Sequence, residues 1–264
     1  MPELPEAEAN RLRVERDCLH RTIEAAEPGD DVSYIELPGD NERARLVGHQ
    51  FTRTHRHGKL IFAGSESGPW ICVHLGMSGS LRPFDEGAEN GGGPPDYTKF
   101  VIRFEGERRL AFSCPRKLGW VRVVDSPEAE IARIGFGPDA LEIGREAFAE
   151  VIGTSRGAIK SALIEQTKLA GVGNLWSDEI LYRVGVDPER KGTDLSDSQL
   201  GDAYDAMHNI LHAVVDTQAD YSKLPDDWLI HTRDEGAECP RCGGEIVRTK
   251  VGGRSAYHCT RHQK

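Results

Sequence analysis

The chain has 264 residues, 38% of them hydrophobic and 29 of them glycine, so it has enough apolar surface for a sizeable core and is not disordered throughout. At roughly 150 residues per domain, this length suggests about two domains with room for a small appendage. No apolar run approaches the ~20 residues of a membrane-spanning helix, and the charged start lacks the apolar segment of a signal peptide. We therefore expect a cytoplasmic protein.

The net charge of −10 argues at first against a nucleic-acid partner. The charges are unevenly distributed, however. Residues 239–264 contain six basic residues and one acidic residue, and two further basic runs lie at 53–59 and 108–117. Acidic residues gather in 24–42 and 187–205. An acidic body with local basic stripes is compatible with a phosphate-binding face.

The first half of the chain is rich in short β-type runs. A helix is expected over 5–19, although its apolar stripe is weak. Short strands with glycine-rich turns then predict a sandwich or barrel. The strands are expected at 51–54, 60–63, 70–74, 99–104, 109–112 and 120–124. The glycine-rich run 85–96 predicts a flexible loop.

The second half has helical periodicity. Helices are expected at 126–134, 145–151, 158–165, 175–183 and 196–217. A break near 135–138 predicts a linker. A third unit, beginning near residue 225, is too small for a core of its own and needs a metal or a neighbour to fold. The sequence thus predicts an α+β multidomain protein with a helix and β-sandwich in 1–125, a helical domain in 136–224 and a small unit in 225–264.

A metal site is indicated near the C-terminus. Cys239 and Cys242 form one pair with a two-residue gap, and after sixteen intervening residues Cys259 and His262 repeat that spacing. Such pairs are typical of a tetrahedral zinc site, and thiolates favour zinc over magnesium or calcium. His258 competes for the fourth position, but only His262 repeats the spacing. Four protein ligands make the zinc structural. The alternative is three unrelated cysteines, and the other three cysteines are expected to be buried thiols.

The amino terminus carries a second signal. Removal of Met1 would leave Pro2 as a free secondary amine, which can attack an aldehyde carbon and form an iminium. An α-amino group titrates near pH 8, so a useful fraction is neutral at physiological pH. Glu3 could act as general acid or base. Taken alone, the ordinary alternative is favoured, because proline and acidic residues are common at helix starts.

A third signal is the run 166–174. An apolar helix stops there, two glycines make a tight turn, and Asn174 is positioned to cap the next helix. This helix–two-turn–helix pattern presents backbone N–H groups and an amide to a phosphate. The alternative is an ordinary αα-hairpin.

Together these motifs closely resemble the formamidopyrimidine-DNA glycosylase/endonuclease VIII family, on the formamidopyrimidine-DNA glycosylase branch. The resemblance covers essentially the whole chain and rests on PELPEAE from Pro2, HGK ending at Lys59, HLGMSG from His74, CPRKLG from Cys114, LAGVGN ending at Asn174 and the terminal Cys/His hairpin. It implies an N-terminal helix plus β-sandwich, a helix–two-turn–helix α domain and a C-terminal zinc-finger β-hairpin with one structural Zn²⁺.

The resemblance also implies roles for individual residues. The catalytic set would comprise Pro2 as nucleophile at C1′ of the damaged nucleotide, Glu3 as acid/base, Glu6 as support and Lys59 as a phosphate contact that assists elimination. Further contacts to the DNA backbone would come from His74, Asn174, Arg254 and, more weakly, Lys160. The gap left by the flipped nucleotide would be filled by Met77, Arg116 and Leu118.

The implied function is a bifunctional DNA glycosylase/AP lyase of base excision repair. It would remove oxidised bases, formamidopyrimidines and 8-oxoguanine among them, from double-stranded DNA and nick the strand by β,δ-elimination through a Schiff base on the N-terminal proline. We expect it to act as a monomer. The alternatives are an oxidised-pyrimidine-preferring glycosylase and a catalytically silent damaged-DNA-binding protein of the same fold. A zinc-ribbon adaptor is a distant third, because it leaves Pro2 and Lys59 unexplained.

The sequence departs from the family pattern at four places. His262 stands where the fourth zinc cysteine is usual, Leu118 replaces a phenylalanine wedge, and Cys114 replaces an acid. The run 220–239 is short, so the loop that caps 8-oxoguanine is expected to be truncated or rebuilt. This favours formamidopyrimidines or oxidised pyrimidines as substrates.

Overall fold

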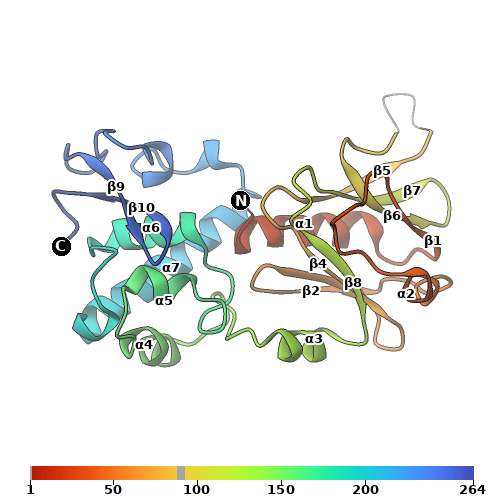
Figure 1. Ribbon diagram of the computed structural model, residues 1–264, viewed down its shortest axis with the longest axis horizontal. Coiled ribbons are helices and arrows are strands. Elements are labelled where there is room, and N and C mark those ends of the chain that lie inside the picture. Colours follow the sequence, from red (N-terminus) through yellow and green to blue (C-terminus); the bar gives the residue numbers. More distant parts are fainter. Residues whose placement is uncertain (1, 88–92) are drawn as a thin grey trace. The chain divides into compact units, whose positions relative to one another are not determined.

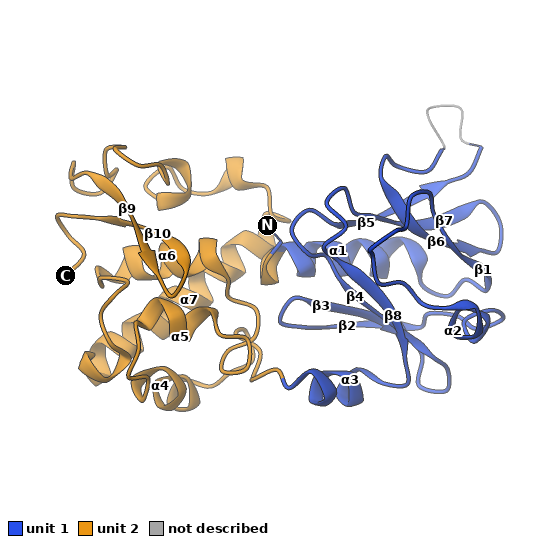
Figure 2. Cartoon of the chain, viewed as in Figure 1, with its two compact units in different colours: residues 1–2, 6–135 blue, residues 3–5, 136–264 orange. Residues whose placement is uncertain are grey.

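The computed structural model describes residues 2–87 and 93–264. The chain forms two compact units, of which unit 1 comprises residues 1–2 and 6–135 and unit 2 comprises 3–5 and 136–264 (Figure 2). Each unit has a hydrophobic core of its own. The expected α+β fold with a β-sandwich, a helical domain and a C-terminal hairpin is confirmed. The finer domain boundary at residue 225 stays a prediction.

Unit 1 is built from two four-stranded antiparallel sheets (Figure 1). One sheet has the order β1 (Ile23–Pro28), β6 (Thr98–Phe104), β7 (Arg108–Ser113), β5 (Ser80–Asp85). The other has the order β2 (Arg53–His57), β3 (Leu60–Gly64), β4 (Trp70–His74), β8 (Trp120–Val124). Side chains of both sheets, such as Val73 and Phe112, share one core, which makes the pair a sandwich. Helices α2 (Asp40–Ala44) and α3 (Pro127–Ile134) also belong to unit 1.

Helix α1 (Leu4–Cys18) shows why its apolar stripe is weak in the sequence. Its buried positions after the first turn include Ala7, Val14 and Cys18, which are small or weakly apolar, and a polar residue, Asn10. The Asn10 Oδ1 accepts a hydrogen bond from the backbone N–H of Leu81 (2.7 Å). A buried polar side chain that finds such a partner can replace an apolar one on a helix face.

The sequence did not predict three elements of unit 1, namely β1, β5 and α2. Strands β1 and β5 are the two edge strands of their sheet, and β5 contains Pro83. Proline is tolerated at a sheet edge, where its missing N–H breaks no ladder, but it weakens the sequence signal for a strand. The strand expected at 51–54 lies instead at 53–57.

Unit 2 contains four helices, three 3₁₀ turns and a hairpin among its described residues. The helices are α4 (Arg145–Gly153), α5 (Ile159–Ile164), α6 (Asn174–Val184) and α7 (Asp197–Asp216). The 3₁₀ turns are η1 (Gly192–Asp194), η2 (Tyr221–Lys223) and η3 (Leu229–His231), and the hairpin strands are β9 (Ile246–Val251) and β10 (Arg254–Cys259). The α7 helix begins with a capping box between Ser196 and Gln199. No helix in the described part of the chain is long and apolar enough to cross a membrane.

The turn that leads into α6 differs from expectation in one detail. Gly173, not Asn174, occupies the N-cap, and Asn174 is the first helical residue. The preceding Gly171 has φ +115°, which a residue with a Cβ adopts only with strain. At the other end, Gly185 closes the helix in the left-handed conformation with φ +68°.

Candidate functional site

The carboxylate of Glu3 lies at the amino-terminal end of α6 and is 1% exposed. Its Oε2 accepts hydrogen bonds from the backbone N–H of Gly173 (2.8 Å) and Trp176 (3.3 Å), and its Oε1 accepts one from Leu175 (2.9 Å). These are donors that a helix leaves unpaired in its first turn, and the helix dipole adds a favourable field there. We call this arrangement the Glu3 cradle.

The cradle requires glycine at position 173. A Cβ added there would lie 2.7 Å from the Glu3 Oε2 and closer still to the other carboxylate oxygen. The backbone of Gly173 is extended, so close approach and not a positive φ is what excludes a side chain. The sequence indicated a tight turn at 171–173, but the partner of that turn is 170 residues away and left no local signal.

Pro2 and Glu6 flank the cradle residue in sequence. Pro2 is partly buried and directly precedes Glu3, while Glu6 is partly buried in the first turn of α1. Leu4, the first residue of α1, donates its N–H to the carbonyl oxygen of Gly171 (3.1 Å). The chain end is therefore held at two consecutive residues, Glu3 and Leu4, by the turn before α6.

Lys59 occupies the two-residue turn between β2 and β3. Gly58, with φ +56°, supplies the positive φ that such a hairpin needs. The next residue, Leu60, pairs with His74 of β4, so Lys59 and His74 are neighbours at one end of the sheet. Unit 1 thus brings together two of the residues expected to contact phosphate.

His74 is held as a neutral imidazole. Burial, reinforced by the positive charges of Lys59 and Arg122, lowers the pKa of His74 to about 4. Its Nδ1 accepts a hydrogen bond from the backbone N–H of Gly76 (3.3 Å), so the proton resides on Nε2. The ring stacks on Trp120 with centroids 5.6 Å apart. His74 can therefore donate an N–H to a phosphate oxygen without carrying a charge.

The three expected wedge residues lie on one surface of unit 1. Met77 and Leu118 are 39% and 53% exposed, and Arg116 is exposed as well. The Arg116 N–H donates to the Ser78 hydroxyl (3.3 Å), which joins the two segments that carry them. A core position for Met77 is excluded by its exposure. Exposed apolar side chains beside a cation are what an insertion into a base stack requires.

In unit 2, Asn174 and Arg254 have polar groups available. The buried Oδ1 of Asn174 has no hydrogen-bond partner among the described residues. Arg254 follows the Gly252–Gly253 turn of the hairpin, is exposed, and forms no ion pair with a described residue. The Asn174 Oδ1 can accept a hydrogen bond from a ligand, and the Arg254 guanidinium can donate to one.

The expected phosphate contact by Lys160 needs correction. Its side chain is fully buried, and its Nζ forms an ion pair with Asp178, whose side chain is also fully buried. The Nζ also donates to the carbonyl oxygen of Asn174 (3.2 Å) and the Ser177 hydroxyl (3.3 Å). An ammonium with no exposed surface cannot contact DNA, so Lys160 acts inside the protein.

The structure brings the four expected metal ligands together. The ligand atoms of Cys239, Cys242, Cys259 and His262 all lie within 4.8 Å of one another. The Cys242 Sγ lies 3.4 Å from the Cys259 Sγ and 3.4 Å from the His262 Nδ1. Such spacings fit a tetrahedral zinc with Zn–S bonds of ~2.3 Å. His258 lies in β10 and does not join this group. We call residues 239–262 the zinc hairpin.

One residue of α6, Tyr182, contacts two members of the cluster. Its carbonyl oxygen accepts from the His262 Nε2 (3.1 Å), which leaves the His262 Nδ1 unprotonated and free to bind metal. Its hydroxyl lies 3.2 Å from the Cys239 Sγ. The donor set and this second layer of contacts fit one structural zinc ion. Sequence spacing revealed the ligands but not Tyr182.

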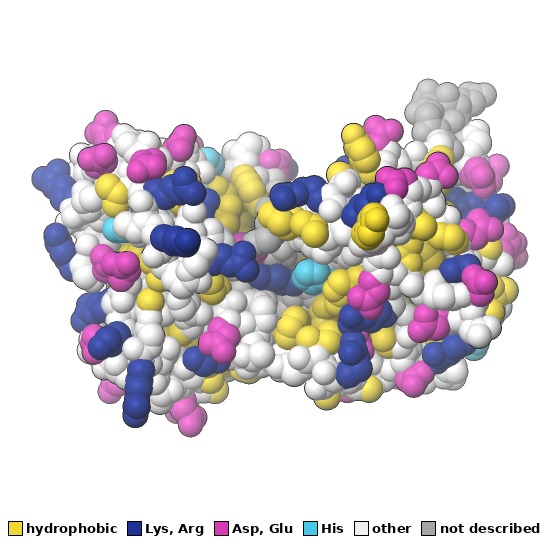
Figure 3. All heavy atoms as spheres, viewed as in Figure 1, with side chains coloured by type: hydrophobic (Ala, Val, Ile, Leu, Met, Phe, Trp, Pro, Cys, Tyr) yellow, Lys and Arg dark blue, Asp and Glu magenta, His cyan; other side chains and the backbone are white. Residues whose placement is uncertain are grey.

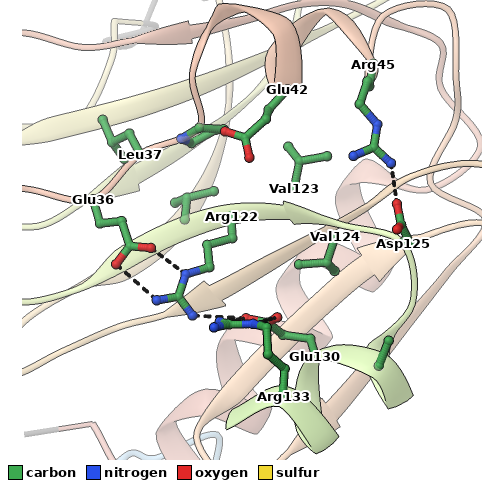
Figure 4. A pocket seen from close by; sticks show the side chains of 13 residues that line it. Glu36, Leu37, Glu42, Arg45, Arg122, Val123, Val124, Asp125, Glu130 and Arg133 are labelled. Carbon is green, nitrogen blue, oxygen red and sulfur yellow. Dashed lines mark hydrogen bonds and ion pairs between the residues drawn. The ribbon is translucent and has the colours of Figure 1, made fainter.

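A surface pocket of unit 1 lies apart from these residues. Its volume is about 460 Å³, and none of the expected site residues lines it. Arg122 lies between Glu36 and Glu130, and Arg45 faces Asp125 (Figure 4). Because its arginines are paired with carboxylates, the pocket offers no strong charge to a ligand. Across the face shown in Figure 3, acidic and basic side chains are likewise interspersed.

Comparison with known proteins covers the whole chain. Residues 1–121 match the formamidopyrimidine-DNA glycosylase N-terminal domain, 134–226 match the H2TH domain of the same enzyme, and 236–261 match a zinc finger found in FPG and IleRS. Formamidopyrimidine-DNA glycosylases of Gluconobacter oxydans and Roseiflexus sp. are 32% and 30% identical, with full coverage of both chains. A Lactococcus lactis formamidopyrimidine-DNA glycosylase bound to DNA with an AP site has the same fold, with a TM-score of 0.85, 24% identity and full coverage of both chains.

Proposed function

Because the chain belongs to the formamidopyrimidine-DNA glycosylase family, we propose that it is a base-excision-repair enzyme that removes oxidised bases from double-stranded DNA and then cleaves the strand at the abasic site. The observation that carries the proposal is the Glu3 cradle. It fixes the residue next to Pro2 with three backbone N–H donors. Once Met1 is removed, a buried carboxylate directly follows a chain-terminal amine in the chain, which supplies the two groups that nucleophilic catalysis with acid/base assistance needs.

In the proposed reaction, Pro2 acts as an amine nucleophile after removal of Met1. Its nitrogen forms a bond to C1′ of the flipped nucleotide while the bond from C1′ to the damaged base breaks. The nitrogen loses its proton, the C1′–O4′ bond breaks with a proton going to O4′, and the opened sugar carries an iminium at C1′. This iminium withdraws electrons, so a proton can leave C2′ and the 3′ phosphate departs by β-elimination. A second elimination releases the 5′ phosphate. Glu3 is the acid/base near the sugar, and Glu6 supports the site.

The proposed phosphate contacts come from residues with suitable donors. Lys59 at the hairpin turn supplies a charge, and neutral His74 beside it supplies an N–H. In unit 2, Arg254 and the side chain of Asn174 are the corresponding candidates. Contacts of this type position the backbone and carry no sequence preference.

The proposed substrates are formamidopyrimidines first and oxidised pyrimidines as the alternative. The segment between α7 and the zinc hairpin is a short run through η2 and η3 in which Leu224, Trp228 and Leu229 are buried. It therefore leaves little chain for a loop that could cap 8-oxoguanine. Leu118 in place of an aromatic wedge fills space without stacking on bases.

Borohydride trapping on a duplex with a natural abasic site tests the proposal. Wild-type protein is expected to form a covalent adduct, and Pro2→Gly is expected to lose it. Pro94→Gly, at an exposed loop proline of unit 1, is the matched control and should retain trapping. N-terminal mass analysis must show that Met1 is absent. A correctly processed protein that binds the DNA but forms no adduct would instead be a silent binding protein.

We also propose a cytoplasmic location for the protein. A cytoplasmic location would keep the six free cysteines reduced and the zinc ligands available. We expect one zinc ion per chain and one protein molecule on each DNA duplex. Native mass spectrometry can measure both.

A further inference from the structure

Asp178 is a carboxylate in the middle of α6 that the proposed reaction does not use. Its side chain is fully buried, and it holds two cations from different segments of unit 2. Its Oδ1 pairs with Lys160 of α5. Its Oδ2 accepts hydrogen bonds from the Nε (3.0 Å) and Nη2 (2.7 Å) of Arg233, which follows η3. A buried charge is stable only when it is paired and hydrogen-bonded in this way.

The Lys160 side of this arrangement leads to the Glu3 cradle. The Lys160 Nζ donates to the carbonyl oxygen of Asn174 (3.2 Å), and Asn174 lies between two of the residues whose N–H groups bind Glu3. Burial lowers the pKa of Lys160, while the neighbouring Asp178 and Glu3 carboxylates oppose that shift. Asp178 thus keeps Lys160 charged and in place beneath the first turn of α6.

The Arg233 side leads to the zinc hairpin. The Arg233 guanidinium lies 4.4 Å from the centroid of the Tyr257 ring, a cation–π contact. Tyr257 is in β10, the strand that begins with Arg254 and ends with the zinc ligand Cys259. Asp178 fixes the guanidinium on which this strand packs, and it thereby fixes the strand that presents Arg254.

We propose that Asp178 is a positioning residue that sets two parts of the site at once, the Glu3 cradle through Lys160 and the DNA-contacting strand β10 through Arg233. The proposal rests on the proposed function for the meaning of these two parts. It assigns Asp178 no contact with substrate. One buried carboxylate would thus fix the positions of both the amino-terminal end of α6 and the zinc hairpin.

Asp178 acts through two contacts, a cradle arm through Lys160 and a hairpin arm through Arg233. Removing each arm should have a different effect. Lys160→Met removes the cradle arm and should lower the single-turnover nicking rate at saturating DNA about tenfold, because a small misplacement of a reacting group is costly. Its affinity for a duplex with a tetrahydrofuran abasic-site analogue should stay within about twofold. Arg233→Gln should weaken that affinity about threefold, on the scale of one cation–π contact, and leave the saturated rate unchanged. Asp178→Asn should both lower the nicking rate and weaken the affinity for DNA.

Asp202→Asn, at an exposed aspartate of α7, is the matched control and should change neither quantity. Melting temperature and zinc content are measured for each variant, so loss of fold is distinguished from loss of position. If Asp178→Asn does not fold, the Lys160→Met and Arg233→Gln variants decide the question. The proposal is overturned if folded Asp178→Asn matches the wild type in rate and affinity, or if both single-arm variants change the same quantity. A wild-type protein without nicking activity would instead refute the proposed function.

Discussion

The Glu3 cradle makes a sharp prediction for Gly173→Ala. The new methyl group would lie 2.7 Å or less from the carboxylate oxygens, whereas ordinary contact needs about 3.4 Å, so the carboxylate must retreat by up to about 1 Å. A displacement of that size breaks at least one N–H···carboxylate bond, and such bonds contribute about 1.5–3 kcal/mol each. One such loss corresponds to a rate effect of roughly 10- to 100-fold.

The assay is single-turnover nicking of a duplex with one natural abasic site at saturating enzyme. Gly173→Ala should be slower by that factor while affinity for the tetrahydrofuran analogue changes less than about threefold. Gly157→Ala is the matched control, because a Cβ there meets nothing within 4 Å. A Gly173→Ala rate equal to that of the wild type would refute the idea that Glu3 must sit in the cradle for catalysis.

Three further predictions concern other parts of the molecule. Burial raises the pKa of Glu179 to about 7, so the folded state favours the protonated carboxyl. The stability that this protonated carboxyl gives the folded state is lost as pH rises from about 4.5 through 7. The melting temperature of Glu179→Gln should therefore match that of the wild type at about pH 5 and exceed it at about pH 8.5. Tyr182→Phe should speed zinc transfer to a chromogenic chelator about tenfold, whereas Tyr204→Phe should not. DNA affinity should fall steeply between about 50 and 200 mM salt, and Arg254→Gln should reduce the slope of log affinity against log salt by about one. A flat salt response would contradict backbone contacts as the basis of binding.

Local patterns predicted those features whose cause is local. The zinc ligands follow from spacing within one hairpin. The helices of unit 2 follow from periodicity, with boundaries that differ by a few residues from prediction. These features were accessible because each depends on residues close together in the chain.

Features that depend on distant partners were not accessible. Lys160 looks like a surface cation in the sequence, and only the approach of Asp178 and Arg233 makes its burial tolerable. In the Glu3 cradle, the Glu3 carboxylate binds Gly173, which is 170 residues away in the chain. The buried face of α1 was obscured because Asn10 takes an apolar position by bonding to β5.

The distribution of thiols has a consequence for how the protein withstands oxidants. Cys18, Cys72 and Cys114 are buried away from oxidants. Burial also raises the pKa of Cys18 to about 12 and that of Cys72 as well, so the Cys18 and Cys72 sulfurs stay protonated and inert. The other three cysteines face the metal position, where a zinc ion would bind them as thiolates. Peroxide, which also damages DNA bases, would therefore attack the repair protein first at the zinc hairpin, and inactivation should be accompanied by stoichiometric metal release.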